Sequence, residues 1–182
     1  MAQVKGTLFV DYVRMLRSKK DVDWSRYLSP QDLAYLVERI SSDEWYPMAT
    51  FERMGVAILA EIAMGDVGLV RQWGRLQIDW LCQVHPNLVA PNDPVESLMR
   101  FKVLRQGFFD YAALTMREVT DGEAVVVIAY GMGARAEEAA SYQTMGFFER
   151  LLEAAGAESV SIGFTAMSWE GATETILAMQ WR

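Results

Sequence analysis

The stretch that decides the fold reads MGFFERLLEAAGA from Met145 to Ala157, and two apolar runs follow it, Val160 to Phe164 and Thr175 to Trp181. Its residues as far as Ala155 form the second half of a helix that is predicted over Gly133 to Ala155. A turn at Trp169 to Gly171 separates the two runs, so they predict a β-hairpin. The sequence therefore predicts a helix and then a hairpin at this end of the chain.

A second hairpin precedes that helix. Two apolar runs, Ala113 to Val119 and Ala124 to Tyr130, flank the dipeptide Asp121-Gly122. Both turn residues tolerate a positive φ, which makes Asp-Gly between apolar runs a strong hairpin signal. Two hairpins separated by a helix predict a four-stranded antiparallel sheet. The helix between them carries small residues that would allow close approach to that sheet: Ala136, Ala139, Ala140 and Gly146.

The first half of the chain is predicted to be mainly helical. One helix is expected over Gly6 to Arg17. The cap Ser29-Pro30-Gln31-Asp32 starts a second helix, which is expected to continue to about Ile40. A third follows Pro47, because apolar residues recur there at helical spacing: Phe51, Met54, Ile58, Leu59 and Ile62.

Two more helices are expected before the first hairpin. Gly65-Asp66 ends one helix and caps the next, which stops at His85-Pro86. That helix carries a mixed, aromatic-rich stripe of Val70, Trp73, Gln77, Trp80, Leu81 and Val84. The cap Asp93-Pro94-Val95-Glu96 begins a helix to about Phe108.

These elements predict an α+β fold with a helical N-terminal half packed on the four-stranded antiparallel sheet. The chain has 182 residues, of which 52% are hydrophobic, enough for one well-buried core. We therefore expect a single domain over residues 1–182. Its mainly helical layer would span 1–108, and hairpin, helix and hairpin would span 109–182.

Charge and hydropathy narrow the class of partner and the location. The net charge of −7 argues against nucleic acid, whose binding needs clustered Lys and Arg. The sequence lacks an export signal and any apolar run of the roughly 20 residues that a membrane span requires. The expected location is the cytoplasm.

Nothing in the sequence assembles into a catalytic or metal centre. Cys82 is the single cysteine and His85 the single histidine, so no tetrahedral metal site can be composed. Their spacing of three allows a thiolate–imidazole pair, but a lone cysteine on an apolar helix is more often a small buried side chain. We expect a protein that is not an enzyme and has no metal.

The closing helix and hairpin resemble the superfamily that includes the haem nitric-oxide-binding domains, the V4R ligand domains and the Golgi tethering-complex subunits. The whole chain also resembles a group of paralogous myxobacterial proteins of unassigned function. Haem-binding members carry a proximal histidine on a helix and a downstream Tyr-x-Ser-x-Arg signature. Here His85 stands at a helix end, and no such signature follows it, so no cofactor is expected. The resemblance also implies pairing through N-terminal helices, which points to Phe51 to Trp80 as a dimer interface.

The turn before the predicted helix at Gly133 is a weak candidate for binding an anion. Gly131, Gly133 and Arg135 belong to a formal match to the glycine-rich dinucleotide fingerprint. However, Glu137 and Glu138 occupy the first helical turn, where they suit the helix dipole but would repel a phosphate. A tight turn from strand to helix is the favoured interpretation.

Aromatic and methionine side chains are more numerous than a small core requires. Such residues line apolar ligand cavities and are also enriched at protein interfaces. Most are expected to be core, and the remainder are candidates for a ligand cavity or an interface. The candidates are Trp45, Tyr46, Phe51, Met54, Ile58, Trp73, Trp80, Phe101 and Phe108.

Taken together, the sequence predicts a regulatory or scaffold module that binds rather than catalyses. Its expected partners are a second copy of itself and, as the alternative, another protein. The alternative is a signalling sensor that holds a hydrophobic small molecule between the helical layer and the sheet. An enzyme of unknown chemistry ranks third, because no acid–base pair or activated nucleophile can be placed.

Overall fold

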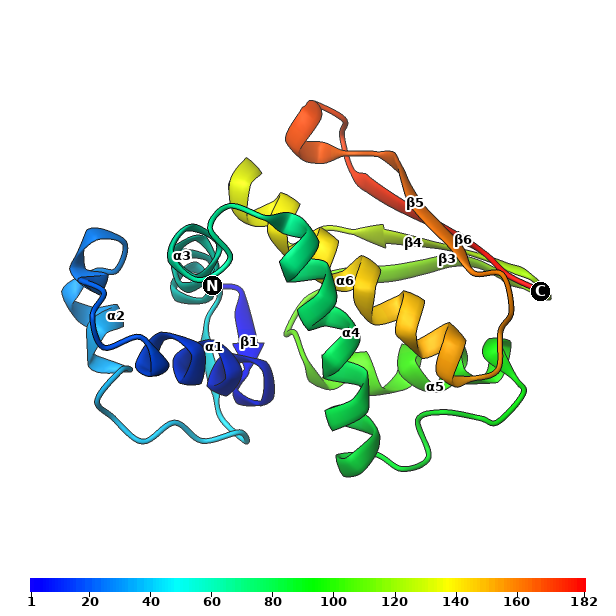
Figure 1. Ribbon diagram of the computed structural model, residues 1–182, viewed down its shortest axis with the longest axis horizontal. Helices are drawn as coiled ribbons and strands as arrows, with labels where there is room; N and C mark the ends of the chain where they lie inside the picture. The colour runs from blue at the N-terminus through cyan, green and yellow to red at the C-terminus, as the bar shows by residue number, and fades with distance from the viewer. The chain divides into compact units, whose positions relative to one another are not determined.

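The computed structural model describes residues 1–182 and divides into two compact units (Figure 1). The helical unit comprises residues 1–66 and 106–111, and the sheet unit comprises 67–105 and 112–182. This division differs from the expected layers, because the helices between 67 and 105 group with the sheet. The single domain spanning 1–182 stays a prediction.

The sheet unit contains the predicted four-stranded antiparallel sheet, so the α+β fold class is confirmed. Its strands are β3 (Leu114–Thr120), β4 (Glu123–Ile128), β5 (Ser161–Ala166) and β6 (Thr175–Gln180), in the order β3-β4-β6-β5. Gly122 has φ of +101° in the turn between β3 and β4, whereas Asp121 keeps a negative φ, so only one of the two turn residues uses the left-handed region. A short 3-10 helix, η3 (Ser168–Glu170), lies in the second hairpin, and Gly171 after it has φ of +99°.

One face of this sheet is buried and carries the core of the unit. In β6, Thr175, Leu177 and Met179 are buried, and they alternate with more exposed residues, as the two-residue period of a strand dictates. The predicted helix is α6 (Ala134–Ala154), which lies against the sheet (Figure 1). The ring of Tyr142 on α6 contacts Phe164 on β5 edge-on, with centroids 5.3 Å apart.

Helix α4 (Val67–Val84) packs along α6 within the same unit, and the two run in the same direction (Figure 1). Glycines set how closely they approach. A Cβ on Gly74 would lie 1.9 Å from the carbonyl oxygen of Gln143, and a Cβ on Gly146 would lie 1.9 Å from that of Arg71. The prediction that Gly146 faces the sheet is therefore wrong, since its close neighbour is the backbone of α4.

Helix α5 (Pro94–Leu104) also packs on α6 and begins at the predicted cap. The Asp93 carboxylate accepts a hydrogen bond from the backbone N–H of Glu96, at 2.8 Å. The helix is shorter than predicted, because residues Arg105–Gly107 continue as the 3-10 turn η2. Phe101 of α5 is buried against Phe147 and Phe148 of α6.

The helical unit is built on α1 (Gly6–Ser18) and α3 (Met48–Glu61), both close to their predicted bounds. Two three-residue strands, β1 (Gln3–Lys5) and β2 (Trp45–Pro47), pair antiparallel beside them and were not predicted. Rings join these elements: Phe9 stacks on Tyr46 at 4.3 Å and Tyr12 on Phe51 at 4.1 Å between centroids.

The second helix is much shorter than predicted: α2 covers only Pro30–Ala34, after the 3-10 helix η1 (Trp24–Arg26). The helix was expected to reach Ile40. Instead the guanidinium of Arg17 donates hydrogen bonds to the carbonyl oxygens of Tyr35, Leu36 and Glu38. A contact from α1, far away in sequence, thus satisfies carbonyls of the turns that replace the rest of the helix.

The cap of α2 is the polar centre of the helical unit. Asp32 is almost fully buried, and its carboxylate accepts hydrogen bonds from Ser29, Thr50 and both Nε and Nη2 of Arg53. Burial by itself would raise the pKa of Asp32, but the hydrogen bonds from Arg53, Thr50 and Ser29 together lower it below its ordinary value. The cluster ties α2 to α3.

Candidate functional site

The most unusual surface of the sheet unit lies along α4. Five large apolar side chains recur there at spacings of four, three, four and four residues, so they share one side of the helix. Leu69, Leu76, Trp80 and Val84 are 43%, 63%, 38% and 52% exposed, and Trp73 is half-buried. We call these five residues, Leu69, Trp73, Leu76, Trp80 and Val84, the α4 strip.

The opposite side of α4 is fully used in packing. Val70, Gly74, Ile78 and Leu81 are buried, and Gly74 faces the backbone of α6. The helix cannot rotate to bury the α4 strip, because rotation would move a Cβ-bearing residue into the place of Gly74. The outward orientation of the strip is therefore fixed by the packing of the helix.

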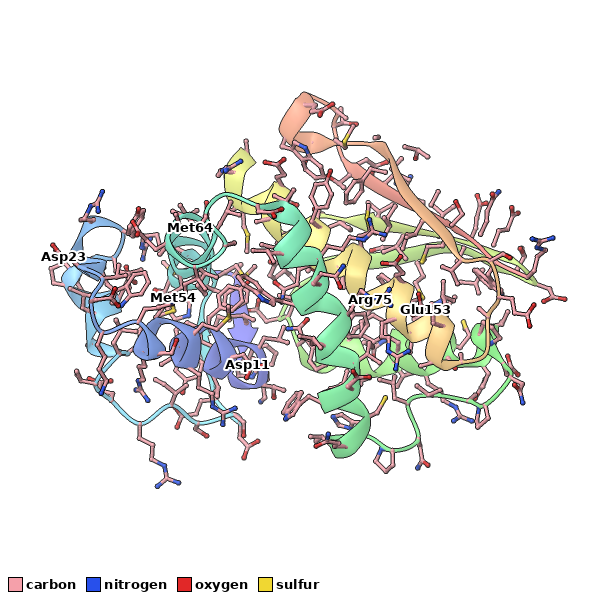
Figure 2. All side chains as sticks on the ribbon, in the orientation of Figure 1. Asp11, Asp23, Met54, Met64, Arg75 and Glu153 are labelled. Carbon is pink, nitrogen blue, oxygen red and sulfur yellow. The ribbon has the colours of Figure 1, made fainter.

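All the charged side chains of α4 pair with α6 and stay off the α4 strip. Arg71 forms a bidentate pair with Glu149, at 2.8 and 3.1 Å. Arg75 reaches both Glu149, at 3.1 Å, and Glu153, at 2.7 Å, and Figure 2 shows Arg75 and Glu153 between the two helices. Asp79 pairs with Arg150 at 3.3 Å. What remains outward on α4 is apolar, with uncharged Gln72, Gln77 and Gln83 beside it.

A hollow of about 330 Å³ continues the α4 strip at its C-terminal end. Apolar residues from α4, the following loop and α5 line it together with polar or charged ones: Val84, His85, Pro86, Asn87, Leu88, Arg100, Val103 and Leu104. Arg100 is held by Glu96 and by the carbonyl of Asn87, both at 2.8 Å. The hollow is open, since Val84 and Val103 on its walls are 52% and 70% exposed.

Cys82 lies on the α6 side of the same helix and is half-buried. Burial raises the pKa of its thiol and the nearby Asp79 carboxylate raises it further, while Arg150 lowers it. A raised pKa disfavours the thiolate, which is the nucleophilic form. No three His, Cys, Asp or Glu side chains gather closely enough to hold a metal ion.

The loop predicted as a weak anion site contains its own anion. The carboxylate of Glu137, which is only 5% exposed, accepts hydrogen bonds from the backbone N–H groups of Tyr130 and Met132 at 3.0 and 2.9 Å. Gly131 has φ of +72°, Gly133 caps α6, and Arg135 pairs with Glu138 at the surface. An external anion would have to displace Glu137, so the geometry is that of a tight turn.

The other predicted site residues fall into both units. Tyr46, Phe51, Met54, Ile58 and Phe108 are buried in the helical unit, and Trp45 is 38% exposed there beneath the Lys5 ammonium. Phe101 is buried between α5 and α6. Trp73 and Trp80 share the α4 strip. A role of these residues in a ligand cavity stays a prediction.

Sequence reasoning missed the α4 strip as a unit. The predicted stripe mixed two sides of the helix, because it joined the buried Val70 and Leu81 to the exposed Trp80 and Val84. The signal was available: counting from Leu69 at helical spacing selects Trp73, Leu76, Trp80 and Val84. Periodicity alone does not tell which of two apolar sides faces the core.

Comparison with protein-family models and with curated proteins gives no match. Solved structures do match, over nearly the whole chain. The Fe(II) unliganded H-NOX protein from K. algicida has a TM-score of 0.66 at 14% identity, covering 98% of this chain and 96% of that one. A mutant of the H-NOX protein from T. tengcongensis has a TM-score of 0.62 at 15% identity, covering 98% of this chain and 97% of that one.

The H-NOX protein from S. oneidensis in the Fe(II)NO ligation state has a TM-score of 0.61 at 9% identity, covering 98% of this chain and 99% of that one. These likenesses show that the chain has an H-NOX-like fold, which agrees with the predicted resemblance to the haem nitric-oxide-binding superfamily. The predicted relation to V4R domains and to a myxobacterial group stays a prediction.

The fold raises the question of a haem, and the surroundings of the single histidine do not suit one. His85 follows the end of α4, where its backbone carbonyl accepts a hydrogen bond from Leu88 at 2.9 Å. The hollow beside it is open, whereas sites for groups of this size bury most of the ligand surface.

No helix of this protein has the length and apolar character needed to cross a bilayer.

Proposed function

We propose that this protein is a regulatory or scaffold module that works by binding and associates with a second copy of itself. The observation that carries the proposal is the α4 strip, an outward apolar surface on a helix whose packing side is already occupied. Contiguous apolar surface of this kind marks association sites in proteins. Its Trp residues are of the type enriched at the centres of interfaces.

The charge pattern limits where two copies could meet. The protein carries a net charge of −7, so two copies repel each other over most of their surfaces. The α4 strip carries no charge, and the arginines beside it are neutralised by Glu149 and Glu153. Two strips can therefore meet without juxtaposing like charges, which would cost several kcal/mol.

Cys82 and His85 support binding over catalysis. The thiol of Cys82 has a raised pKa, so it lacks the activation that a catalytic nucleophile needs. The His85 carbonyl is fixed in a turn, and its side chain lines an open hollow rather than a closed cleft. Neither residue has the enclosed, polar surroundings typical of an active site.

A second candidate function is a sensor for a hydrophobic small molecule. The H-NOX-like fold over 98% of the chain favours it, since the solved structures of that fold include proteins with Fe(II) and with bound NO. The open surroundings of His85 argue against haem as that ligand. Signalling through such a ligand would follow by analogy of fold, not from a site that these residues define.

Native mass spectrometry of the purified protein, with an absorption spectrum and a denatured mass, separates the two candidates. The proposal predicts a dimer at twice the sequence mass with no visible absorbance. A monomer at every concentration would contradict it. Excess mass that is lost on denaturation would instead establish the sensor as the function, and a Soret band would show that the ligand is haem.

A further inference from the structure

We propose that Arg105 binds an oxyanion, the carboxylate or phosphate group of a small molecule. Arg105 directly follows the last residue of α5 and belongs to the sheet unit. The site is independent of any association between two copies, because it involves neither α4 nor the α4 strip. It goes beyond the binding role proposed above by naming a residue and the chemical group that this residue recognises.

Arg105 occupies the side of α5 that packs inward. It lies four residues after Phe101 and seven after Leu98, so the three residues share one side of the helix. Leu98 and Phe101 are fully buried, and Arg105 is half-buried at the end of their row. The opposite side, which carries the exposed Met99 and Val103, would keep such a cation fully hydrated. The chain thus places this charge where hydration is incomplete.

One donor of Arg105 is enclosed without an acceptor. Its Nε atom is buried and has no hydrogen-bond partner in the chain, whereas its Nη1 and Nη2 atoms are not enclosed and remain within reach of a ligand. Burial lowers the pKa of Arg105, and no carboxylate lies near enough to raise it again. Because a buried charge ordinarily has a partner, the partner of Arg105 is expected to come from outside the chain.

Other arginines of the protein show the form that such a partner takes. Arg53 and Arg71 each offer Nε and Nη2 to the two oxygens of one carboxylate, at distances between 2.6 and 3.1 Å. This planar fork matches the oxygens of a carboxylate or a phosphate. Apart from Arg105, only Arg39 has no oxygen partner in the chain, and Arg39 is exposed. Arg105 alone combines burial with an unused fork.

Two ordinary roles of arginine do not account for this arrangement. A cation near the C-terminal end of a helix complements the helix dipole, but Lys102 already supplies one in the last turn of α5. The dipole is also worth less than an enclosed N–H without an acceptor costs. An arginine can cover apolar surface with its aliphatic stem while its head stays in water, but the Nε of Arg105 is shielded from water.

An NMR titration of the arginine Nε–H signals tests the site directly. Arg105→Lys keeps the charge and removes this group, so the signal missing from its spectrum belongs to Arg105. The probes are sodium acetate and inorganic phosphate, each added at an ionic strength held constant with NaCl. We expect the Arg105 signal to shift and to saturate in the millimolar range with at least one probe, while the Arg39 signal shifts little and without saturation. Saturation with acetate alone assigns a carboxylate, and saturation with phosphate alone assigns a phosphate group.

Urea denaturation supplies a second measurement. Arg105→Met keeps the length of the side chain and removes the unpaired charge, so in NaCl alone its midpoint should equal or exceed that of the unchanged protein. The probe that saturates the signal should raise the midpoint of the unchanged protein and of the control Arg39→Met by more than that of Arg105→Met. An Arg105 signal that shifts no more than that of Arg39 with both probes would overturn the inference. A lower midpoint of Arg105→Met in NaCl alone would also overturn it, since this is the mark of a structural cation.

Discussion

The two units hold their long helices together by different means. In the helical unit, α1 and α3 meet through stacked rings, such as Tyr12 on Phe51 at 4.1 Å. In the sheet unit, α4 and α6 meet backbone to backbone at Gly74 and Gly146. Side chains can adjust their rotamers when a neighbour changes, but a backbone contact cannot. The second kind of contact therefore fixes which side of α4 faces outward.

The largest effect is expected from breaking the backbone contact in the sheet unit. Gly146→Ala places a Cβ 1.9 Å from the carbonyl oxygen of Arg71, so the helices must separate. We expect the free energy of unfolding to fall by more than about 3 kcal/mol, measured by urea denaturation. Gly163→Ala is the matched control, because nothing lies within 4 Å of the added Cβ. Equal stability of the two variants would show that the backbones of α4 and α6 do not approach closely at Gly146.

The next effect concerns the polar centre of the helical unit. Asp32→Ala removes the carboxylate that accepts from the backbone N–H and the hydroxyl of Ser29, the N-cap of α2. It also leaves Arg53 without its partner, so we expect a loss of about 2 kcal/mol. The lowered pKa of Asp32 means that its contribution is fully present above its ordinary pKa of 3.8 and is lost as the pH falls toward the folded value.

The difference in stability between the protein and Asp32→Ala should therefore shrink as the pH falls from about 5 to about 2. Asp21→Ala, at an exposed carboxylate, is the control and should change stability little at any pH. A difference that stays constant over this whole range would show that the Asp32 carboxylate is not stabilised by its partners. Thermal or urea unfolding at several pH values supplies the measurement.

A smaller effect tests the charged edge of the α4–α6 contact. Arg75 is 25% exposed and bridges Glu149 and Glu153. Arg75→Met keeps the aliphatic length and removes the pairs, so we expect a loss of about 1 kcal/mol that diminishes in high salt. The control Arg117→Met breaks a more exposed pair with Glu174 and should cost about half as much or less. A larger loss of stability for Arg117→Met than for Arg75→Met would contradict the greater contribution that we assign to the pairs of Arg75.

The sequence predicted the elements that local patterns determine. Asp121-Gly122 specified one hairpin, the apolar period after Pro47 placed α3, and the bounding glycines with the small residues between them placed α6. The rest depended on contacts between distant residues. Helix α2 ends early because Arg17 binds the carbonyls beyond it, and the strands β1 and β2 are too short to show a period.

The candidate site was predicted only in part, for a related reason. Trp73 and Trp80 were recognised as candidates, but Leu69 and Leu76 were not. An apolar residue on a helix looks the same in sequence whether it faces the core or solvent. Which side of α4 faces the core is determined by Gly74 and by the partners of Arg71 and Arg75 on α6. Those partners lie 78 residues further along the chain.

The central claim is that the charge-free side of α4 joins two copies, and sedimentation velocity over a dilution series tests it most directly. Leu76 is 63% exposed, so Leu76→Glu should change the stability of the fold by less than about 0.5 kcal/mol. It places a negative charge from each copy in a contact between two α4 strips. We predict that the unchanged protein and the control Val37→Glu shift from monomer to dimer with rising concentration, whereas Leu76→Glu stays monomeric. Identical sedimentation of all three proteins would contradict the account.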